Sequence, residues 1–208
     1  MSYFLKNPGV VFGLLLEHVQ MTSLAVLIAI AIALPLALLV SHYRWLSVPV
    51  LGVLGTLYTV PSLALIILLV PIFGLNRQSV IVAIIVYSQA VLARNFLVGL
   101  QSIAPEILEA ARGMGMNFWQ CWWQVQVPLS LPIWLSGVRL ATIVAIAIAT
   151  IGAKFGAGGL GVLLFDGVAQ VRYDKIFAGA ILVSILAFVI DGMLLGLEWL
   201  SSPARKVE

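Results

Sequence analysis

Residues 109–128 read EAARGMGMNFWQCWWQVQVP and separate two long apolar runs of the chain. Just upstream, Pro105 suits the first turn of a helix, and Arg112 lies in the last turn before glycines stop that helix. Asn117 can cap a second helix, because Gln120 lies three residues later in a capping-box pattern. The stretch therefore predicts a helix, a turn and a second helix between two apolar segments.

The composition around this unit is that of an integral membrane protein. Of 208 residues, 62% are hydrophobic and 9% are charged, against roughly 25% charged residues in an ordinary soluble domain. A hydrocarbon core about 30 Å thick needs about 20 apolar helical residues to cross it. The chain therefore has room for a handful of spans and short loops. Its net charge of +3 is spread thinly, without the basic stripe that would predict binding of nucleic acid.

Uncharged stretches bounded by charges or turn residues predict five membrane spans. The predicted fold class is an all-α polytopic membrane protein, with residues 1–208 forming one domain. The first apolar run is longer than that of a secretory signal, so we interpret it as a retained span. Pro61 is expected to kink the second span. The spans are predicted at about 20–41, 48–73, 78–100, 129–151 and 176–199, with the helix, turn, helix segment at about 102–128.

Several kinds of site are excluded or disfavoured by the sequence. A single cysteine, Cys121, excludes an intrachain disulfide and a cysteine-based metal cage. His18 and His42 flank the first span at opposite faces, so we expect two separate interfacial histidines and no metal site. The pattern GAGGLG at 156–161 follows a span rather than a strand, which favours a tight or re-entrant turn over a dinucleotide site. No phosphate-loop pattern and no catalytic triad is present, so we expect no enzyme.

Four residues in or beside the spans are candidates for lining a path through the membrane. They are Tyr58, Ser62, Tyr87 and Asn95. Aromatic rings can hold quaternary ammonium groups by cation–π attraction. Helix-packing contacts are the alternative interpretation of the same residues.

Two charged residues lie inside predicted spans. Arg139 is about 10 Å inside the fourth span, and Asp191 reaches a similar depth in the fifth. An unpaired charge at that depth costs on the order of 3 kcal/mol. We therefore expect the two side chains to pair as a structural ion pair, the alternative being that each reaches separately to the membrane interface.

The spacing within residues 109–128 resembles the EAA loop of ABC importer permeases, a Glu-Ala-Ala, Gly, Ile, Leu-Pro pattern. Here valine stands for Ile and for Leu, and the matching residues are Glu109, Ala110, Ala111, Gly115, Val125, Val127 and Pro128. The segments TVPSLALIILLVPIFGLN, LVGLQSIAPEILEAARGMGM, PLSLPIWLSGVRLAT and GAGGLG are similar to permease subunits of osmoprotectant importers, those for glycine betaine, carnitine and choline. The resemblance extends from about residue 20 to 200. The chain departs from these relatives in lacking bases at CWWQVQ and polar residues at IVAIAIATIGAK.

The resemblance implies a five-span permease subunit of a type I, ATP-driven ABC importer in a bacterial or archaeal plasma (inner) membrane. It places the N-terminus outside and the C-terminus and EAA loop in the cytoplasm, where counting basic residues alone leaves a tie. ATPase subunits would dock on the EAA loop, anchored by Glu109 and approached closely at Ala110 and Ala111. Those ATPases would hold the ATP and Mg²⁺, while the permease would bind no cofactor and catalyse no reaction.

The resemblance also implies the other partners. A second permease subunit, identical or different, would pair with this one around a pathway, and an external binding protein would deliver the solute to residues 152–174. The alternatives are a permease for another small, amino acid-like solute, a secondary carrier, or a membrane assembly subunit unrelated to ABC transporters.

Overall fold

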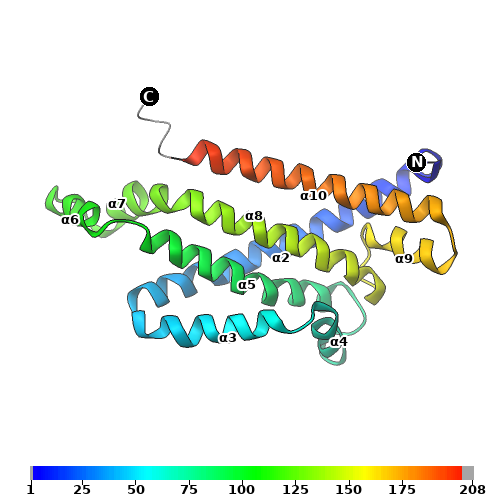
Figure 1. Ribbon diagram of the computed structural model, residues 1–208, viewed down its shortest axis with the longest axis horizontal. Helices are drawn as coiled ribbons and strands as arrows, with labels where there is room; N and C mark the ends of the chain where they lie inside the picture. Colours follow the sequence, from blue (N-terminus) through cyan, green and yellow to red (C-terminus); the bar gives the residue numbers. More distant parts are fainter. Residues whose placement is uncertain (1, 203–208) are drawn as a thin grey trace.

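The computed structural model describes residues 2–202, and every regular element within them is helical. Four long helices run side by side along the long axis of the molecule (Figure 1). They are α2 (Pro8–His42), α5 (Arg77–Gln101), α8 (Val127–Gly152) and α10 (Tyr173–Ser201). The shorter elements are α1 (Ser2–Lys6), η1 (Arg44–Leu46), α3 (Ser47–Thr59), α4 (Ser62–Phe73), α6 (Pro105–Gly113), α7 (Phe118–Cys121), the π-helical turn η2 (Trp122–Gln126), η3 (Ala153–Phe155) and α9 (Gly161–Ala169).

Four helical segments are long and apolar enough to cross a membrane, and the bent pair α3 and α4 supplies a fifth crossing if it is one span. The predicted all-helical, five-span architecture is therefore confirmed. Helices α5, α8 and α10 begin and end within three residues of the third, fourth and fifth predicted spans.

Helix α2 is longer than the first predicted span. It begins at Pro8 rather than near residue 20, and proline suits this first turn because the backbone N–H that it lacks would have no helical partner. Its 35 residues rise about 52 Å, well beyond a hydrocarbon core of about 30 Å. Glu17 and His18 therefore lie inside the helix instead of before it.

The second predicted span is broken rather than kinked. Helices α3 and α4 meet at an angle of 94°. Val60 and Pro61 between them have extended backbone conformations. Proline disfavours the helical conformation of the residue before it and cannot donate a backbone hydrogen bond, so the helix ends instead of bending.

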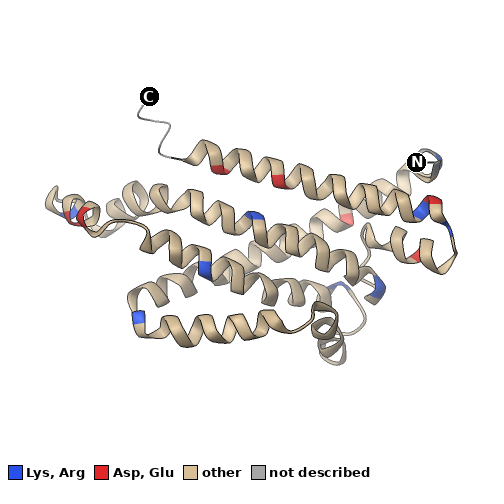
Figure 2. Cartoon of the chain, viewed as in Figure 1, with Lys and Arg blue, Asp and Glu red and all other residues tan. Residues whose placement is uncertain are grey.

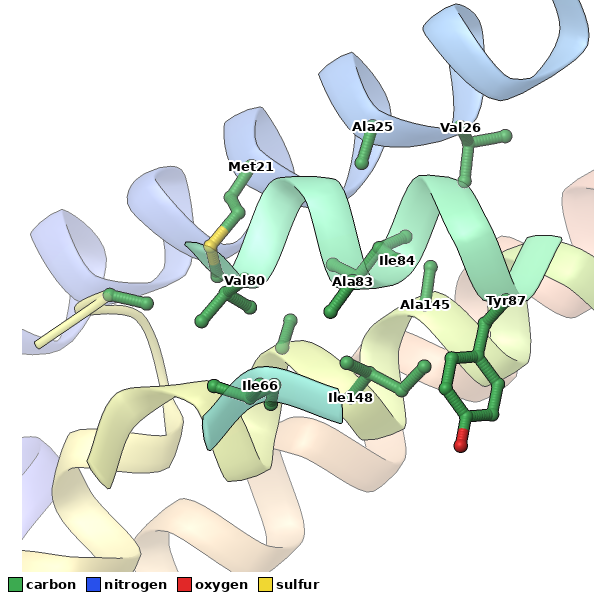
Figure 3. Packing of buried hydrophobic residues seen from close by; sticks show 12 residues of the cluster. Met21, Ala25, Val26, Ile66, Val80, Ala83, Ile84, Tyr87, Ala145 and Ile148 are labelled. Carbon is green, nitrogen blue, oxygen red and sulfur yellow. The ribbon is translucent and has the colours of Figure 1, made fainter. Parts of the chain in front are cut away.

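The core lies where α2, α5 and α8 meet, with α4 crossing beside them (Figure 3). Helices α2, α5 and α8 each contribute a fully buried alanine, at Ala25, Ala83 and Ala145, and α4 contributes the fully buried Ile66. Small residues let helix backbones approach closely, and the resulting van der Waals packing is one of the forces that hold helices together in a membrane. Helix α10 stands at the edge, where only four of its residues are buried.

The two ends of the molecule carry different elements. Helices α6 and α7 lie at one end, and α1, α4 and α9 lie at the other (Figure 1). Charged residues gather mainly at these ends, and few interrupt the long helices between them (Figure 2). The helix, turn, helix unit is therefore separated from the N-terminal end of α2 by the full length of the bundle.

Candidate functional site

Residues 102–128 are called the coupling segment below, because the resemblance implies that an ATPase docks there. They have the predicted helix, turn and helix. Helix α6 begins at Pro105, with Glu106 in its first turn and Arg112 in its last. Charges in these positions oppose the partial charges of the helix ends. The Asn117 side chain accepts from the Gln120 backbone, and the Gln120 side chain accepts from the Asn117 backbone, both at 2.9 Å. This reciprocal capping box fixes the start of α7.

The turn between the two short helices depends on glycine at one position. Gly115 has φ +82°, a left-handed conformation that side chains with a Cβ adopt only at a cost. Gly113, the last residue of α6, has no such requirement, and a Cβ there would meet no atom within 4 Å in the described structure. Gly115 therefore sets the direction in which α7 leaves α6.

The EAA residues do not all lie on the surface. Glu109 and Ala110 are exposed, as is Pro128 at the start of α8, whereas Val125 is half-buried. Ala111 is only 2% exposed, so its small size serves packing within this chain rather than the approach of a partner. Of the three EAA residues on α6, Glu109 and Ala110 are thus the two that a partner could contact.

The second short helix is continuous with a membrane span. Residues 118–155 form one uninterrupted helical segment, because the π-helical turn η2 joins α7 to α8. Trp122 in this turn is buried and stacks on Trp134 of α8, with ring centroids 6.0 Å apart. Trp119 and Trp123 are exposed, as amphipathic aromatic residues at a membrane interface often are. A displacement of α7 thus has a direct helical connection to α8.

Helix α8 is hydrogen-bonded to α5 near the end of the bundle that carries the coupling segment. The Trp134 indole donates to the Phe96 carbonyl at 3.0 Å, and the Ser130 hydroxyl donates to the Gly99 carbonyl at 2.9 Å. Gly99 makes room for this contact, since a Cβ there would lie 2.6 Å from the Trp134 indole nitrogen. The two helices are therefore expected to move together.

Three of the four predicted path residues come close together. A cavity of about 430 Å³ is lined by Tyr58 of α3 and Asn95 of α5. The ring of Tyr87 lies 5.6 Å from that of Tyr58, although Tyr87 itself is buried. Ser62 begins α4, is half-buried and does not line this cavity. Arg94, which lines the same cavity, was not singled out from the sequence.

Arg139 faces two carboxylates rather than one. Its Nε lies 3.7 Å from Asp191 Oδ1, the expected partner, and also 3.7 Å from Glu198 Oε2. These distances are those of ion pairs, too long for hydrogen bonds. Glu198 was missed, although a signal was available: it follows Asp191 by seven residues, or two helical turns, and so shares a face of α10.

The glycine-rich stretch forms a tight turn that covers α2. Gly156, Gly158 and Gly159 all have positive φ. The Gly159 amide donates to Glu17 Oε2 at 3.0 Å, and Arg77 Nε donates to the Ala157 carbonyl at 3.5 Å. The expectation that His18 is a solvated interfacial residue is wrong, because the turn packs on it and leaves it fully buried.

No metal site is found among the described residues, where no three His, Cys, Asp or Glu side chains form a suitable group. Cys121 is buried and free. His42 is exposed at the opposite end of α2 from His18, and it stacks edge-on against Tyr43.

Comparison with known proteins identifies related chains. Residues 19–198 match the family described as binding-protein-dependent transport system inner membrane component. The chain is 37% identical to the osmoprotectant import permease protein OsmW of Salmonella typhimurium, covering 97% of this chain and 96% of that protein. It is 34% identical to the carnitine transport permease protein OpuCB of Listeria monocytogenes, covering 97% and 93%.

Solved structures show the same fold at lower identity. A chain in the inward-facing conformations of the MetNI methionine ABC transporter superposes with a TM-score of 0.81 at 22% identity, covering 93% of this chain and 96% of that one. A chain in the structure of an amino acid ABC transporter with histidines gives a TM-score of 0.71 at 21% identity, covering 96% and 95%.

Proposed function

This chain belongs to the family of inner membrane components of binding-protein-dependent transport systems, and we propose that the solute it moves is a small osmoprotectant such as glycine betaine, carnitine or choline. As a member of that family it is a multi-pass, non-catalytic membrane subunit of an ABC importer. The resemblance to ABC importer permeases is thereby confirmed at the level of the family. The solute is proposed from relatives that are 30–37% identical over nearly the full chain.

The observation that carries the proposal is the exposed face of α6 joined helically to a span. Glu109 and Ala110 are free for contact at one end of the molecule, and α7, η2 and α8 form a continuous helical path inward from there. An ATPase bound to α6 would transmit its movement through α7 and η2 to α8. Because α8 is hydrogen-bonded to α5, the movement would reach the cavity lined by Tyr58 and Asn95.

The proposed assembly contains two permease subunits, two ATPase subunits and one external binding protein. The coupling segment would face the cytoplasm, where the ATPases bind ATP and Mg²⁺. An odd number of crossings would then put the N-terminus outside and the C-terminus inside. Helix α10 has few buried residues, which leaves its surface for lipid or for a second permease, identical or different.

The opposite end would receive the binding protein. The stretch from Gly152 to Asp174 includes the glycine-rich turn, α9 and the exposed residues Val168 and Val171. Arg172 donates to Asp174 at 2.7 Å and so fixes the loop that leads into α10. Bulky labels attached along residues 168–172 should therefore block transport stimulated by the binding protein.

The test is purification of the permease with the ATPase and binding protein encoded beside it, followed by uptake into liposomes. We expect ATP-dependent uptake of an osmoprotectant and its loss in Glu109→Lys, because that change reverses the charge at the proposed docking face. Arg44→Glu also reverses an exposed charge, outside both the coupling segment and residues 152–174, and is the matched control for insertion and expression.

Two results would contradict the proposal. If the Glu109→Lys variant showed normal uptake and normal co-purification of the ATPase, the coupling segment would be only a connector between two spans. Uptake of an amino acid but of no osmoprotectant would leave the family assignment unchanged and show that the proposed solute is wrong.

A further inference from the structure

Arg94 is a charge within a membrane span that has no partner in this chain. It lies seven residues before the end of α5, or about 10 Å from that end. The side chain is exposed, and no residue among 2–202 forms an ion pair or hydrogen bond with it. An arginine that faced lipid there would be energetically unfavourable, so such residues normally face a water-filled cavity or an anion.

The surroundings of Arg94 are those of a ligand cavity. The cavity of about 430 Å³ that Arg94 lines falls within the roughly 300–1,000 Å³ of small-molecule sites. Asn95 lies beside Arg94 and packs against Gly137 of α8, where the absence of a Cβ lets the two helices touch. A polar amide and a guanidinium are thus held on a rigid helix crossing.

An aromatic ring also lines the cavity. Tyr58 lines it and is 41% exposed, and its ring contacts that of Tyr87 at 5.6 Å. The Tyr87 hydroxyl is buried without a hydrogen-bond partner among the described residues, and it points away from the neighbouring core side chains (Figure 3). The cavity therefore combines one cationic group with the aromatic ring of Tyr58, which is backed by the ring of the buried Tyr87.

A second copy of this chain offers no evident carboxylate for Arg94. Within the described spans, Asp191 and Glu198 of α10 both face Arg139, and Glu17 of α2 accepts from the Gly159 amide beside Arg77. The other described acidic residues lie towards the ends of the bundle or in the coupling segment. The anion that Arg94 suits is therefore a small one that enters the cavity.

We propose that this cavity is a solute-binding site for zwitterions that carry both a carboxylate and a quaternary ammonium group, a proposal that rests on the function proposed above. Arg94 binds the carboxylate, since a guanidinium matches carboxylate geometry with two parallel N–H donors. Tyr58, backed by Tyr87, binds the trimethylammonium group through cation–π attraction. Asn95 is a neutral neighbour that can hydrogen-bond the carboxylate without opposing its charge.

The same arrangement selects against choline. Choline has the quaternary ammonium group but a hydroxyl in place of the carboxylate. It would leave Arg94 without a counter-ion and place a second positive charge near it, which is repulsive. The site thus favours glycine betaine and carnitine over choline.

The experiment measures equilibrium binding of radiolabelled glycine betaine to the purified permease and ATPase complex without the binding protein, with choline as competitor. We expect choline to compete at least tenfold more weakly than unlabelled glycine betaine. Arg94→Gln should weaken glycine betaine binding at least tenfold and Tyr58→Leu severalfold, whereas Arg94→Lys should weaken it less than Arg94→Gln, because lysine keeps the charge but loses the two parallel N–H donors. Arg44→Gln removes an exposed charge outside the cavity and is the matched control.

Several results would overturn the inference. They are equal competition by choline, unchanged glycine betaine binding in both the Arg94→Gln and the Tyr58→Leu variants, or no binding by a complex that still imports glycine betaine with its binding protein. In that last case the proposed osmoprotectant function stands. Failure of the complete system to import any osmoprotectant would instead remove the proposed function, so the two failures are distinguishable.

Discussion

The Glu17 carboxylate accepts a hydrogen bond from the backbone amide of Gly159 at 3.0 Å, across 142 residues of sequence. Arg77 lies 4.0 Å from the same carboxylate oxygen and also donates to the Ala157 carbonyl. The start of α5, the N-terminal part of α2 and the glycine-rich turn are thereby joined at one point. This contact closes the end of the bundle opposite the coupling segment.

Gly158→Ala should weaken this closure. Gly158 has φ +77°, and a Cβ there would collide with the Glu17 carboxylate. The left-handed conformation alone costs about 1–2 kcal/mol for a residue with a Cβ. We expect a lower midpoint of thermal denaturation in detergent. Gly13→Ala is the control, since Gly13 is in helix α2 with no atom within 4 Å of its added Cβ in the described structure, and an equal effect of both changes would contradict the prediction.

The Arg139 cluster should tolerate the loss of either carboxylate but not of both. Asp191→Asn or Glu198→Gln alone leaves one counter-ion, so each should cost under about 1 kcal/mol. The double change leaves an unpaired guanidinium at membrane depth and should cost roughly 3 kcal/mol. Thermal denaturation of all three variants measures the excess over additivity. If the effects of the two single changes simply added, Arg139 would reach water without either carboxylate.

The turn of the coupling segment should tolerate substitutions at Gly115 in a defined order. No atom of the described structure lies within 4 Å of an added Cβ, so the cost comes from the positive φ alone. Asn tolerates this conformation best, Ala less well and β-branched Val least. ATPase co-purification and solute uptake should decline in that order. Gly113→Ala should leave both unchanged, and a loss at Gly113 equal to that at Gly115 would mean that bulk matters rather than backbone conformation.

The contact between α5 and α8 gives a double-mutant test. Gly99→Ala places a methyl group 2.6 Å from the Trp134 indole nitrogen and should cost about 1–3 kcal/mol by overpacking. Trp134→Leu removes both the clash and the hydrogen bond to Phe96. The double variant should therefore be more stable in thermal denaturation than the sum of the single effects predicts. Exact additivity would show that α8 shifts freely away from α5.

Local patterns in the sequence were sufficient for the coupling segment. The capping box at Asn117 and Gln120 needs only residues three apart, and the stop at Gly115 needs only the backbone freedom of glycine. Such features depend on neighbours along the chain, so no knowledge of the tertiary structure was required. The long uncharged runs likewise predicted five crossings because a membrane imposes that length directly.

Features that depend on distant segments were missed. The start of α2 was placed too late because Glu17 and His18 looked like boundary residues, yet a turn from the far half of the chain covers them. Pro61 breaks its span rather than kinking it, which its sequence neighbours alone do not reveal. Ala111 matched the motif, but its burial depends on how α6 rests on the bundle.

The π-helical turn Trp122–Gln126 fixes the angular phase between the coupling segment and the span. A π turn corresponds to one residue more than a regular α-helix would hold. Because the wider turn absorbs that extra residue, the helical segments on either side of it keep nearly the relative rotation of a regular α-helix. One residue more in a helix without such a turn would instead rotate the coupling segment by about 100° around the α8 axis and face Glu109 in a different direction. The π turn thus lets the connection hold one more residue while the direction of α6 relative to α8 is preserved.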